Sequence, residues 1–218
     1  MSEAAQGTRA QQRGEGRTAS KRRAILRAAR EVFLRNGYLG TGMDEVAALA
    51  NVSKVTVYKH FSDKHRLFIA VFTGAIEEAE ESSRPLVDHL ADSMDVAEDL
   101  RAFARRHVTL VTQPHLIAMR RMIIAEATRF PELARAWHRA GPARAHATLA
   151  GQIERLARRG LLRVTDPLLA AQHLNYLILS VPVNEAMFTG RDTPYDPAHL
   201  QRFADEAVRV FMAAYGAP

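Results

Sequence analysis

The segment between residues 41 and 64 is rich in side chains that hydrogen-bond to phosphate groups and to the edges of bases. These hydroxyl, ammonium, phenol and imidazole groups belong to Thr41, Ser53, Lys54, Thr56, Tyr58, Lys59, His60 and Lys64. Small hydroxyl side chains and helix N-termini contact phosphate, and lysines neutralise its charge. The pattern therefore indicates binding to a nucleic acid, although Tyr58 could instead be a core aromatic and the lysines could be solvated surface charges.

The same segment predicts two short helices joined by a tight turn, a helix-turn-helix motif at residues 42–61. Thr41-x-x-Asp44 has the spacing of a capping box, in which each side chain accepts a hydrogen bond from a backbone N–H group near the helix start. Asn51 stands where a helix end needs a left-handed residue, and Ser53 can cap the second helix. A second helix of this kind enters the major groove of DNA, which is wide enough for one α-helix.

Charge is distributed unevenly along the chain. The net charge of +6 divides into +7 for residues 1–66 and −1 for residues 67–218, and all four lysines lie in the first part. This distribution favours a basic N-terminal module for a polyanion and a nearly neutral remainder with another role. A basic solvated tail would explain the same charges.

A longer string of residues surrounds the motif. It reads Gly37-Tyr38-x-Gly40-Thr41-Gly42-Met43-Asp44-Glu45-Val46-Ala47, followed by Ala50-Asn51-Val52-Ser53-Lys54-x-Thr56-Val57-Tyr58-Lys59-His60-Phe61-Ser62-x-Lys64. Over about residues 19–79 the chain resembles the DNA-binding domain of the TetR family of bacterial transcriptional regulators. The resemblance implies DNA contacts at the matching positions: phosphate contacts from Thr41, Tyr58 and Lys64, base contacts from Lys54, Val55 and Thr56, and backbone or base contacts from Lys59 and His60.

The domain plan follows from helical periodicity. No segment alternates apolar and polar residues as a half-buried strand would, so we expect an all-α protein of about nine helices. Residues 1–18 are expected to form a flexible basic arm. Residues 19–79 would form a three-helix helix-turn-helix domain, and residues 80–218 the helical ligand-binding and dimerisation domain that the resemblance implies.

Capping residues and breakers predict several helix boundaries. Helices are expected to follow Ser62, Asp95, Asp166 and Asp196, whose side chains can accept from backbone N–H groups. One long helix is expected at residues 131–159, with a kink or break at Gly141-Pro142.

The predicted helix at residues 166–189 is apolar nearly all round. A helix that is apolar on every face is buried on every face, so the side that does not pack on its own domain needs a partner. The resemblance implies that this helix and the one at residues 196–215 pair with their copies across a two-fold axis. Such a homodimer would present two recognition helices, about one DNA turn (~34 Å) apart or somewhat more, to a palindromic operator in double-stranded DNA.

The resemblance also implies a pocket for a small apolar or amphipathic inducer. The candidates are polar, aromatic and methionine side chains among apolar helices, namely His107, Met119, Met122, Glu126, Trp137, Asn175, Tyr176, Asn184, Met187 and Phe188. A methionine or aromatic residue at helical spacing is more often part of the core. Asn175 is the strongest candidate, because an amide on an apolar helix needs a hydrogen-bond partner from protein, water or ligand.

Other classes of protein fit the sequence poorly. Cysteine is absent, which excludes disulfide scaffolds and cysteine nucleophiles. No nucleophile elbow, phosphate-binding loop or zinc-binding helix motif occurs, so we expect no enzyme, no cofactor and no metal ion. No apolar run is long enough to span a membrane and no signal peptide is evident, which favours a cytoplasmic protein.

Three alternatives to a ligand-responsive homodimeric repressor remain open. A constitutive DNA-binding factor would show no ligand-induced loss of operator binding. A small all-α enzyme would show turnover without sequence-specific DNA binding. A protein–protein adaptor would keep its activity when Lys54 and Tyr58 are replaced.

Overall fold

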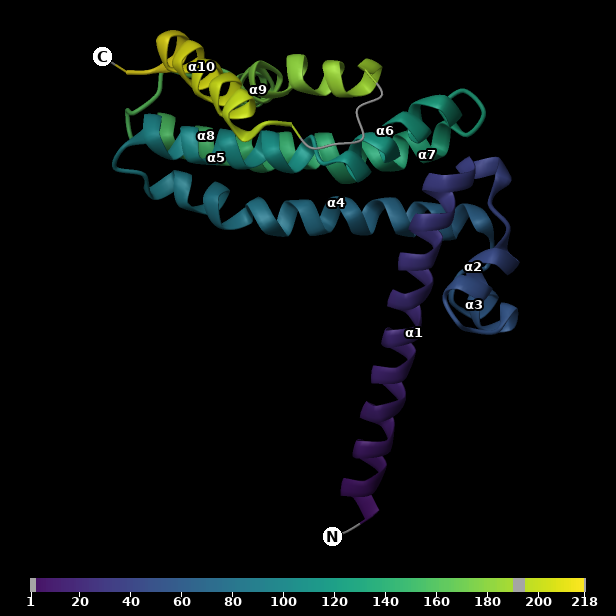
Figure 1. Cartoon of the computed structure of the whole chain (residues 1–218). Coiled ribbons are helices and arrows are strands. Elements are labelled where there is room, and N and C mark those ends of the chain that lie inside the picture. The colour runs from purple at the N-terminus through teal and green to yellow at the C-terminus, as the bar shows by residue number, and fades with distance from the viewer. Residues whose placement is uncertain (1–2, 190–194, 218) are drawn as a thin grey trace. The chain divides into compact units, whose positions relative to one another are not determined.

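The computed structural model describes the backbone of residues 3–189 and 195–217 (Figure 1). Within these residues the elements are helices, with an isolated bridge between Leu162 and Gly216, which confirms the all-α prediction. The chain divides into two compact units, Met1–Phe72 and Thr73–Pro218, and the division falls inside helix α4 (Lys64–His89). No helix among the described residues is long and apolar enough to cross a lipid bilayer.

The first unit is built around a cluster of aromatic rings. Its helices are α1 (Glu3–Gly40), α2 (Met43–Leu49), α3 (Lys54–His60) and the first turns of α4. The ring of Phe68 on α4 lies 4.9 Å from the ring centroids of both Phe33 and Tyr38 and 4.0 Å from that of Phe72. Edge-to-face contacts of this kind add to the burial of each ring and join α4 to α1.

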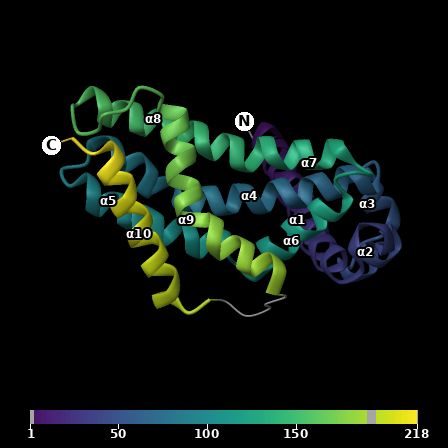
Figure 2. The ribbon, with the colours of Figure 1, turned by 90° about the horizontal axis from the view of Figure 1, so that it is seen from above.

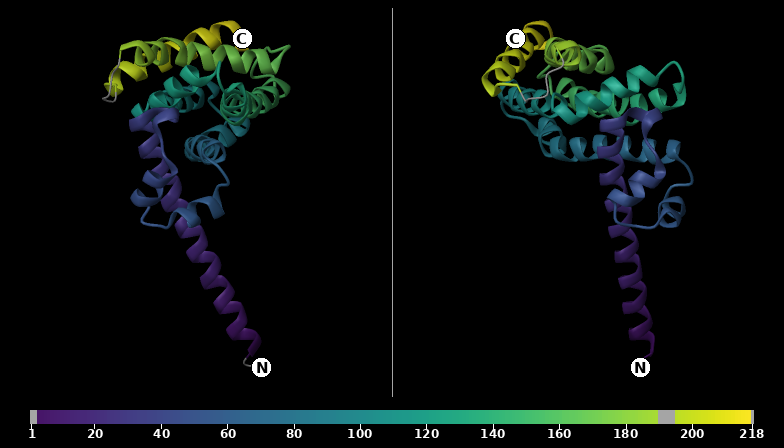
Figure 3. Two further views of the ribbon diagram at one scale, coloured as in Figure 1. Left: turned by 90° about the vertical axis from the view of Figure 1, so that its right-hand side faces the viewer. Right: turned by 45° about the vertical axis from the view of Figure 1, so that its right-hand side comes forward.

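Helix α1 differs from its prediction at one end and agrees at the other. Residues 3–18, expected to form a flexible arm, are the first part of α1, which extends beyond α2 and α3 (Figure 3). Eleven of these 16 residues are alanine, glutamine, arginine or glutamate, good helix formers that outnumber the three glycines, and extending a helix costs far less than starting one. At the C-terminal end the backbone leaves the helical conformation at Gly37 (φ 71°), where the helix is predicted to close.

Two predicted caps in the first unit are wrong. Helix α2 begins after Gly42, which has no side chain to cap it, and the hydroxyl of Thr41 donates to the Gly37 carbonyl oxygen (2.7 Å). Helix α4 is capped by Asp63 rather than Ser62, and Asp63 Oδ1 accepts from the backbone N–H of Arg66 at 2.7 Å. A carboxylate accepts more strongly than a hydroxyl and also favours the positive end of the helix dipole.

The second unit contains the remaining helices. They are η1 (Leu90–Asp92), α5 (Val96–Val111), α6 (Pro114–Glu126), α7 (Pro131–His138), η2 (Arg139–Ala143), α8 (Arg144–Arg158), α9 (Pro167–Thr189) and α10 (Pro197–Tyr215). The described residues thus hold ten α-helices rather than about nine, because the π-helical segment η2 divides the long helix predicted at residues 131–159. Pro142 lies in η2 and lacks the N–H group that an α-helix would use there. The caps predicted at Asp95, Asp166 and Asp196 are confirmed.

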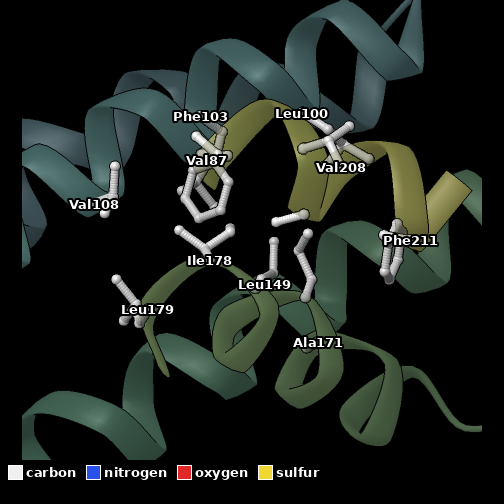
Figure 4. Packing of buried hydrophobic residues seen from close by; sticks show 14 of the residues in the cluster. Val87, Leu100, Phe103, Val108, Leu149, Ala171, Ile178, Leu179, Val208 and Phe211 are labelled. Atoms are coloured by element: carbon white, nitrogen blue, oxygen red, sulfur yellow. The ribbon is translucent and has the colours of Figure 1, made fainter. Parts of the chain in front are cut away.

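The core of the second unit lies between two layers of helices. Helices α9 and α10 lie side by side and pack on α8 and α5 (Figures 1 and 2). Figure 4 shows Ile178 of α9 pointing toward Phe103 of α5, and Val208 of α10 beside Leu100 of α5 in the same buried cluster. A bidentate ion pair between Arg105 and Asp205 (2.7 and 2.9 Å) joins α5 to α10 at the edge of this core. This arrangement gives α9 one face that is buried in its own unit.

Candidate functional site

The turn before α3 sets the direction in which that helix leaves α2. Asn51 adopts a left-handed conformation (φ 52°), as predicted, and is the only residue other than glycine with a positive φ among the described residues. Ser53 then caps α3, since its hydroxyl oxygen accepts from the backbone N–H of Thr56 (3.2 Å) and lies 2.8 Å from the Thr56 hydroxyl. The cap satisfies one of the N–H groups that a helix start leaves unpaired.

Helix α3 has a buried face and an exposed face. Val57 is fully buried, whereas Val55 is 77% exposed, Tyr58 is 43% exposed and Lys59 is exposed as well. Residues 55, 58 and 59 follow the i, i+3, i+4 spacing of one helix face. Tyr58 is therefore a surface residue and not a core aromatic, while Phe61, at the end of α3, is buried. The exposed face offers an apolar side chain, a phenol and an ammonium group on one rigid helix.

The two other lysines of the motif have partners within the first unit. The Lys54 ammonium lies 2.7 Å from Asp44 Oδ1, and hydrogen bonding to this carboxylate raises the pKa of Lys54. The Lys64 ammonium donates to the carbonyl oxygens of Leu39 (3.1 Å) and Thr41 (3.0 Å). Lys54 remains on the surface with its ion pair, whereas Lys64 closes the C-terminal end of α1.

Thr41 lies in the interior rather than on the surface. Its side chain is 3% exposed, and its hydroxyl donates to Gly37 as described above. The phosphate contact that the resemblance implies for this side chain is not available in this conformation.

Two cations of α1 that lie outside the helix-turn-helix motif are close enough to His60 to affect its pKa. Burial, followed by the positive charges of Arg22, Lys59 and Lys21, lowers the pKa of His60. The guanidinium of Arg22 also lies 5.3 Å from the ring centroid of Phe61. Lys21 and Arg22 thus extend the basic surface of α3, and the run of cations Lys21-Arg22-Arg23 is the sequence signal that points to them.

A second group of polar side chains lies inside the C-terminal unit. His107 Nε2 on α5 is 3.0 Å from Asn175 Oδ1 on α9, which is the partner that the Asn175 amide was expected to need. Phe103 stacks on the His107 ring at 5.2 Å. Burial lowers the pKa of His107 more than the hydrogen bond to Asn175 raises it, so the ring is neutral at physiological pH.

The group continues from Asn175 to α8, α6 and α7. Tyr176, the next residue on α9, has its ring 5.8 Å from that of His146 on α8. Tyr176 also interacts electrostatically with Arg120 on α6, whose guanidinium lies 5.0 Å from the ring centroid of Trp137 on α7. These contacts connect residues of five helices, here called the polar cluster: His107, Arg120, Trp137, His146, Asn175 and Tyr176.

The remaining candidates for the ligand pocket lie elsewhere or show no contact with the cluster. Met119 is buried, Met122 and Glu126 are partly exposed, and Met187 packs against the core. Asn184 is exposed and its amide donates to the Ser180 carbonyl oxygen on its own helix, while Phe188 is 85% exposed. Sequence reasoning missed Arg120 and His146, because an arginine or a lone histidine on an amphipathic helix carries no sign of burial.

Helix α9 also presents a row of exposed apolar side chains. Large hydrophobic side chains with at least 39% exposure on this helix are Leu168, Leu169, Tyr176, Leu177, Val181 and Phe188. Several large exposed apolar side chains on one helix are typical of an interaction site. The described residues contain no group of three or more side chains that could hold a metal ion.

Comparison with known proteins identifies the family. Residues 25–71 match the model of bacterial regulatory proteins of the tetR family, and residues 98–217 match the C-terminal domain of AefR-like transcriptional repressors. The chain is 31% identical over 210 residues to the DNA-binding transcriptional repressor TetR of Mycobacteroides abscessus, an alignment that covers 92% of this chain and 96% of that protein. It therefore belongs to the TetR family of transcriptional regulators, as the helix-turn-helix string indicates.

Two solved structures are similar to this chain over most of its length, and one further relative is similar over a short segment. A TetR-family transcriptional regulator of Mesorhizobium loti has a TM-score of 0.87 and 40% identity, covering 92% of this chain and 99% of that one. The flavonoid-responsive regulator FrrA has a TM-score of 0.74 and 28% identity, covering 90% of this chain and 97% of that one. The transcriptional activator FasR of Mycolicibacterium smegmatis is 51% identical over 51 residues, which is 23% of this chain and 23% of that protein.

Proposed function

We propose that this protein is a ligand-responsive homodimeric repressor in the cytoplasm, without enzymatic activity. Two copies of α3 would bind a palindromic operator, and a small apolar or amphipathic molecule in the C-terminal unit would release it. The observation that carries the proposal is the exposed face of α3, with Val55, Tyr58 and Lys59 beside the cap at Ser53.

The chemistry of this face suits the major groove. Val55 offers methyl groups for contact with thymine methyls, and Tyr58 and Lys59 offer donors to phosphate. Lys54 can exchange its surface partner Asp44 for a phosphate group, and Thr56 adds a hydroxyl. His60, Lys21 and Arg22 provide positive charge next to the helix. Thr41 and Lys64, whose polar atoms are engaged inside the unit, would hold α1 and α2 in place rather than contact DNA first.

Helix α9 supports the homodimer. Its buried face packs in its own unit, while its exposed apolar row has no cover in a single chain. A two-fold axis would pair this row with the same row of a second copy, together with α10, as expected from the sequence.

The same helix links the dimer to the ligand. Asn175 and Tyr176 belong to the polar cluster, and Tyr176 and Leu177 belong to the exposed row. A ligand that binds one dimer geometry more tightly than another would shift the dimer toward that geometry and change operator affinity. The name of FrrA, a flavonoid-responsive relative, supports a small-molecule response in this chain.

One family model and one relative favour repression over activation. The C-terminal family model and the M. abscessus relative are both described as repressors, and both cover the C-terminal half. FasR, described as an activator, aligns over only 51 residues, so we do not extend activation to this chain.

Selection of bound DNA tests the proposal. Full-length protein and the Tyr58→Ala variant would be incubated with upstream DNA and random pools at a stated salt concentration. We expect the wild type alone to enrich a palindrome, because Tyr58 is an exposed donor at the centre of the α3 face. Enrichment without symmetry, or binding that both proteins share, would contradict the repressor.

A charge-matched pair of variants then identifies the contacting face. Lys59→Gln is expected to reduce the slope of log affinity against log salt concentration by about 1, since one phosphate contact is lost. Arg101→Gln removes one positive charge from the surface of α5, where Arg101 pairs with Glu98. Its slope should equal that of the wild type.

A further inference from the structure

The guanidinium of Arg120 is a half-buried cation without an anionic partner. In the part of the chain that the structure describes, it forms no hydrogen bond or ion pair, and it contacts the ring face of Trp137. Burial lowers its pKa, although an arginine this basic remains charged at neutral pH. A ring face compensates a desolvated charge only in part, so an anion in this position would be stabilised.

Among the described residues, three other arginines of the same unit have hydrogen-bond partners on other elements, unlike Arg120. Arg121, the next residue, donates to the backbone carbonyl oxygens of Ala186 and Met187. Arg105 pairs with Asp205, and Arg159 donates to the carbonyl oxygens of Ala91 (2.6 Å) and Ser93 (2.8 Å). These three arginines join elements through hydrogen bonds, whereas the Arg120 guanidinium contacts a ring face and has no oxygen acceptor within the described part of the chain.

His146 supplies a second unsatisfied polar atom in the polar cluster. Its side chain is 6% exposed, and its Nε2 atom is buried without a hydrogen-bond partner. A buried polar atom left in this state costs free energy that a bound oxygen can recover. Burial lowers the pKa of His146, so the neutral ring offers either one donor or one acceptor at Nε2, depending on its tautomer.

An aromatic ring lies next to each of these two polar groups. The Arg120 guanidinium lies 5.0 Å from the ring centroid of Trp137, and the His146 ring lies 5.8 Å from that of Tyr176, which also interacts electrostatically with Arg120. Flat rings and a guanidinium plane favour a flat, π-rich partner. An aliphatic chain would gain none of these ring contacts.

We propose that the polar cluster binds an aromatic anion: a planar ring that carries a carboxylate or an ionised phenol. The anionic oxygen would lie at the Arg120 guanidinium, and the ring would lie against Trp137 and Tyr176, on the side where the Tyr176 ring lies 5.8 Å from that of His146. This inference rests on the proposed function, since it names the chemical class of the inducer.

Calorimetry with the full-length protein tests the chemical class. The probes are 2-naphthoate, its neutral analogue 2-naphthamide, octanoate as an anion without a ring, and 4-nitrophenolate at mildly alkaline pH as the phenolate. We expect 2-naphthoate to bind about 10- to 100-fold more tightly than the amide, as a charge-assisted pair with arginine would give. Comparison with 4-nitrophenolate separates the two sources of the anionic oxygen.

Variants of Arg120 assign the charge. Arg120→Gln should weaken 2-naphthoate binding by about 10- to 100-fold and leave 2-naphthamide unchanged. Arg120→Lys keeps the charge and should retain part of the affinity, which guards against a variant that merely fails to fold. The matched control is Arg129→Gln, an exposed arginine 5.5 Å from the ring centroid of Phe130, and it should behave as the wild type.

Several results would overturn the inference. They are equal binding of the acid and the amide, full affinity in Arg120→Gln, octanoate binding as tightly as 2-naphthoate, and no binding of any aromatic anion. Operator affinity measured with each probe separates this inference from the proposed function. Release by a neutral ligand alone would contradict the aromatic anion and keep the ligand-responsive repressor. Arg120-dependent binding that leaves operator affinity unchanged would keep the aromatic anion and contradict the ligand-responsive repressor.

Discussion

The exposed face of α3 and the polar cluster differ in how the chain assembles them. The α3 face comes from residues 53–60, and its cap and turn depend on neighbours within a few residues. The polar cluster joins five helices, and its His107–Asn175 contact spans 68 residues. Local structure can therefore present the first site, whereas the second exists only when the whole C-terminal unit is packed. Substitutions should accordingly act separately on the two units.

The largest effect on operator binding is expected from a charge in the exposed row of α9. Leu177→Arg would bury an unpaired charge in the proposed dimer interface, weakening association by about 100- to 1,000-fold and abolishing binding to a two-half-site operator. Analytical ultracentrifugation measures the association. The control is Met94→Arg, at a side chain that is 94% exposed outside α9. A Leu177→Arg protein that stays dimeric would show that this row is not the interface.

A cavity in the first unit should lower the unfolding temperature of that unit and leave that of the C-terminal unit unchanged. Phe68 is fully buried among the rings of Phe33, Tyr38 and Phe72, and Phe68→Ala should destabilise this unit by about 3–5 kcal/mol. DNA binding should be lost first on heating. Trp137, the single tryptophan of the chain, lies in the C-terminal unit, so its fluorescence transition should keep its wild-type midpoint. An equal shift of the Trp137 transition would show that the units unfold together.

Acid should weaken the C-terminal unit through its buried histidines. The pKa of His107 is lowered by burial from the ordinary 6.5, so on acidification the unfolded chain takes up a proton that the folded chain refuses. Stability is complete above that ordinary value and falls as the pH drops below it, by up to about 1.4 kcal/mol per pH unit for each such histidine. Urea unfolding followed by Trp137 fluorescence, from about pH 7.5 to about pH 5.5, measures the slope.

Replacing the histidines checks the cause of this pH dependence. His107→Gln can keep a hydrogen bond to Asn175 but cannot titrate, so its slope should be shallower than that of the wild type. The double variant with His146→Gln should be shallower again, because burial lowers the pKa of His146 as well. An unchanged slope in the double variant would assign the acid sensitivity to other groups.

The smallest effect is expected at the ion pair beside α3. Asp44→Asn releases the Lys54 ammonium and removes a negative charge from the surface that we propose faces DNA. Since exposed ion pairs contribute up to about 1 kcal/mol, operator affinity should rise about two- to fivefold. Asp88→Asn, an exposed acid on α4 in the C-terminal unit, makes the same change in net charge. An equal gain in both variants would mean that only net charge matters.

Helix starts show how far local patterns predict structure. Ser53, Asp95, Asp166 and Asp196 were each predicted as caps, and each accepts a backbone N–H group. The Thr41 prediction failed because α2 begins one residue later than expected, after Gly42, and the Thr41 hydroxyl donates to the Gly37 carbonyl oxygen. Ser62 failed because the adjacent carboxylate of Asp63 competes for the same role.

The candidate sites divide in the same way. The sequence predicts the α3 residues from their types and spacing, but the exposed state of Tyr58 and the buried state of Thr41 depend on how α1, α2 and α3 pack. In the polar cluster, His107, Trp137, Asn175 and Tyr176 were among the candidates. Arg120 and His146 were not, because nothing in an amphipathic pattern distinguishes a buried cation or imidazole from a solvated one.

By itself the sequence determined the helical fold, the helix-turn-helix motif and its family, since periodicity, turn residues and caps act over a few residues. It also determined that α9 is apolar on more faces than one chain can cover. Only the tertiary structure decided which polar side chains meet inside the C-terminal unit and which of them stay unsatisfied. Burial and distance between residues far apart in the chain depend on packing of all the helices at once, and these two quantities set the chemistry of the cluster.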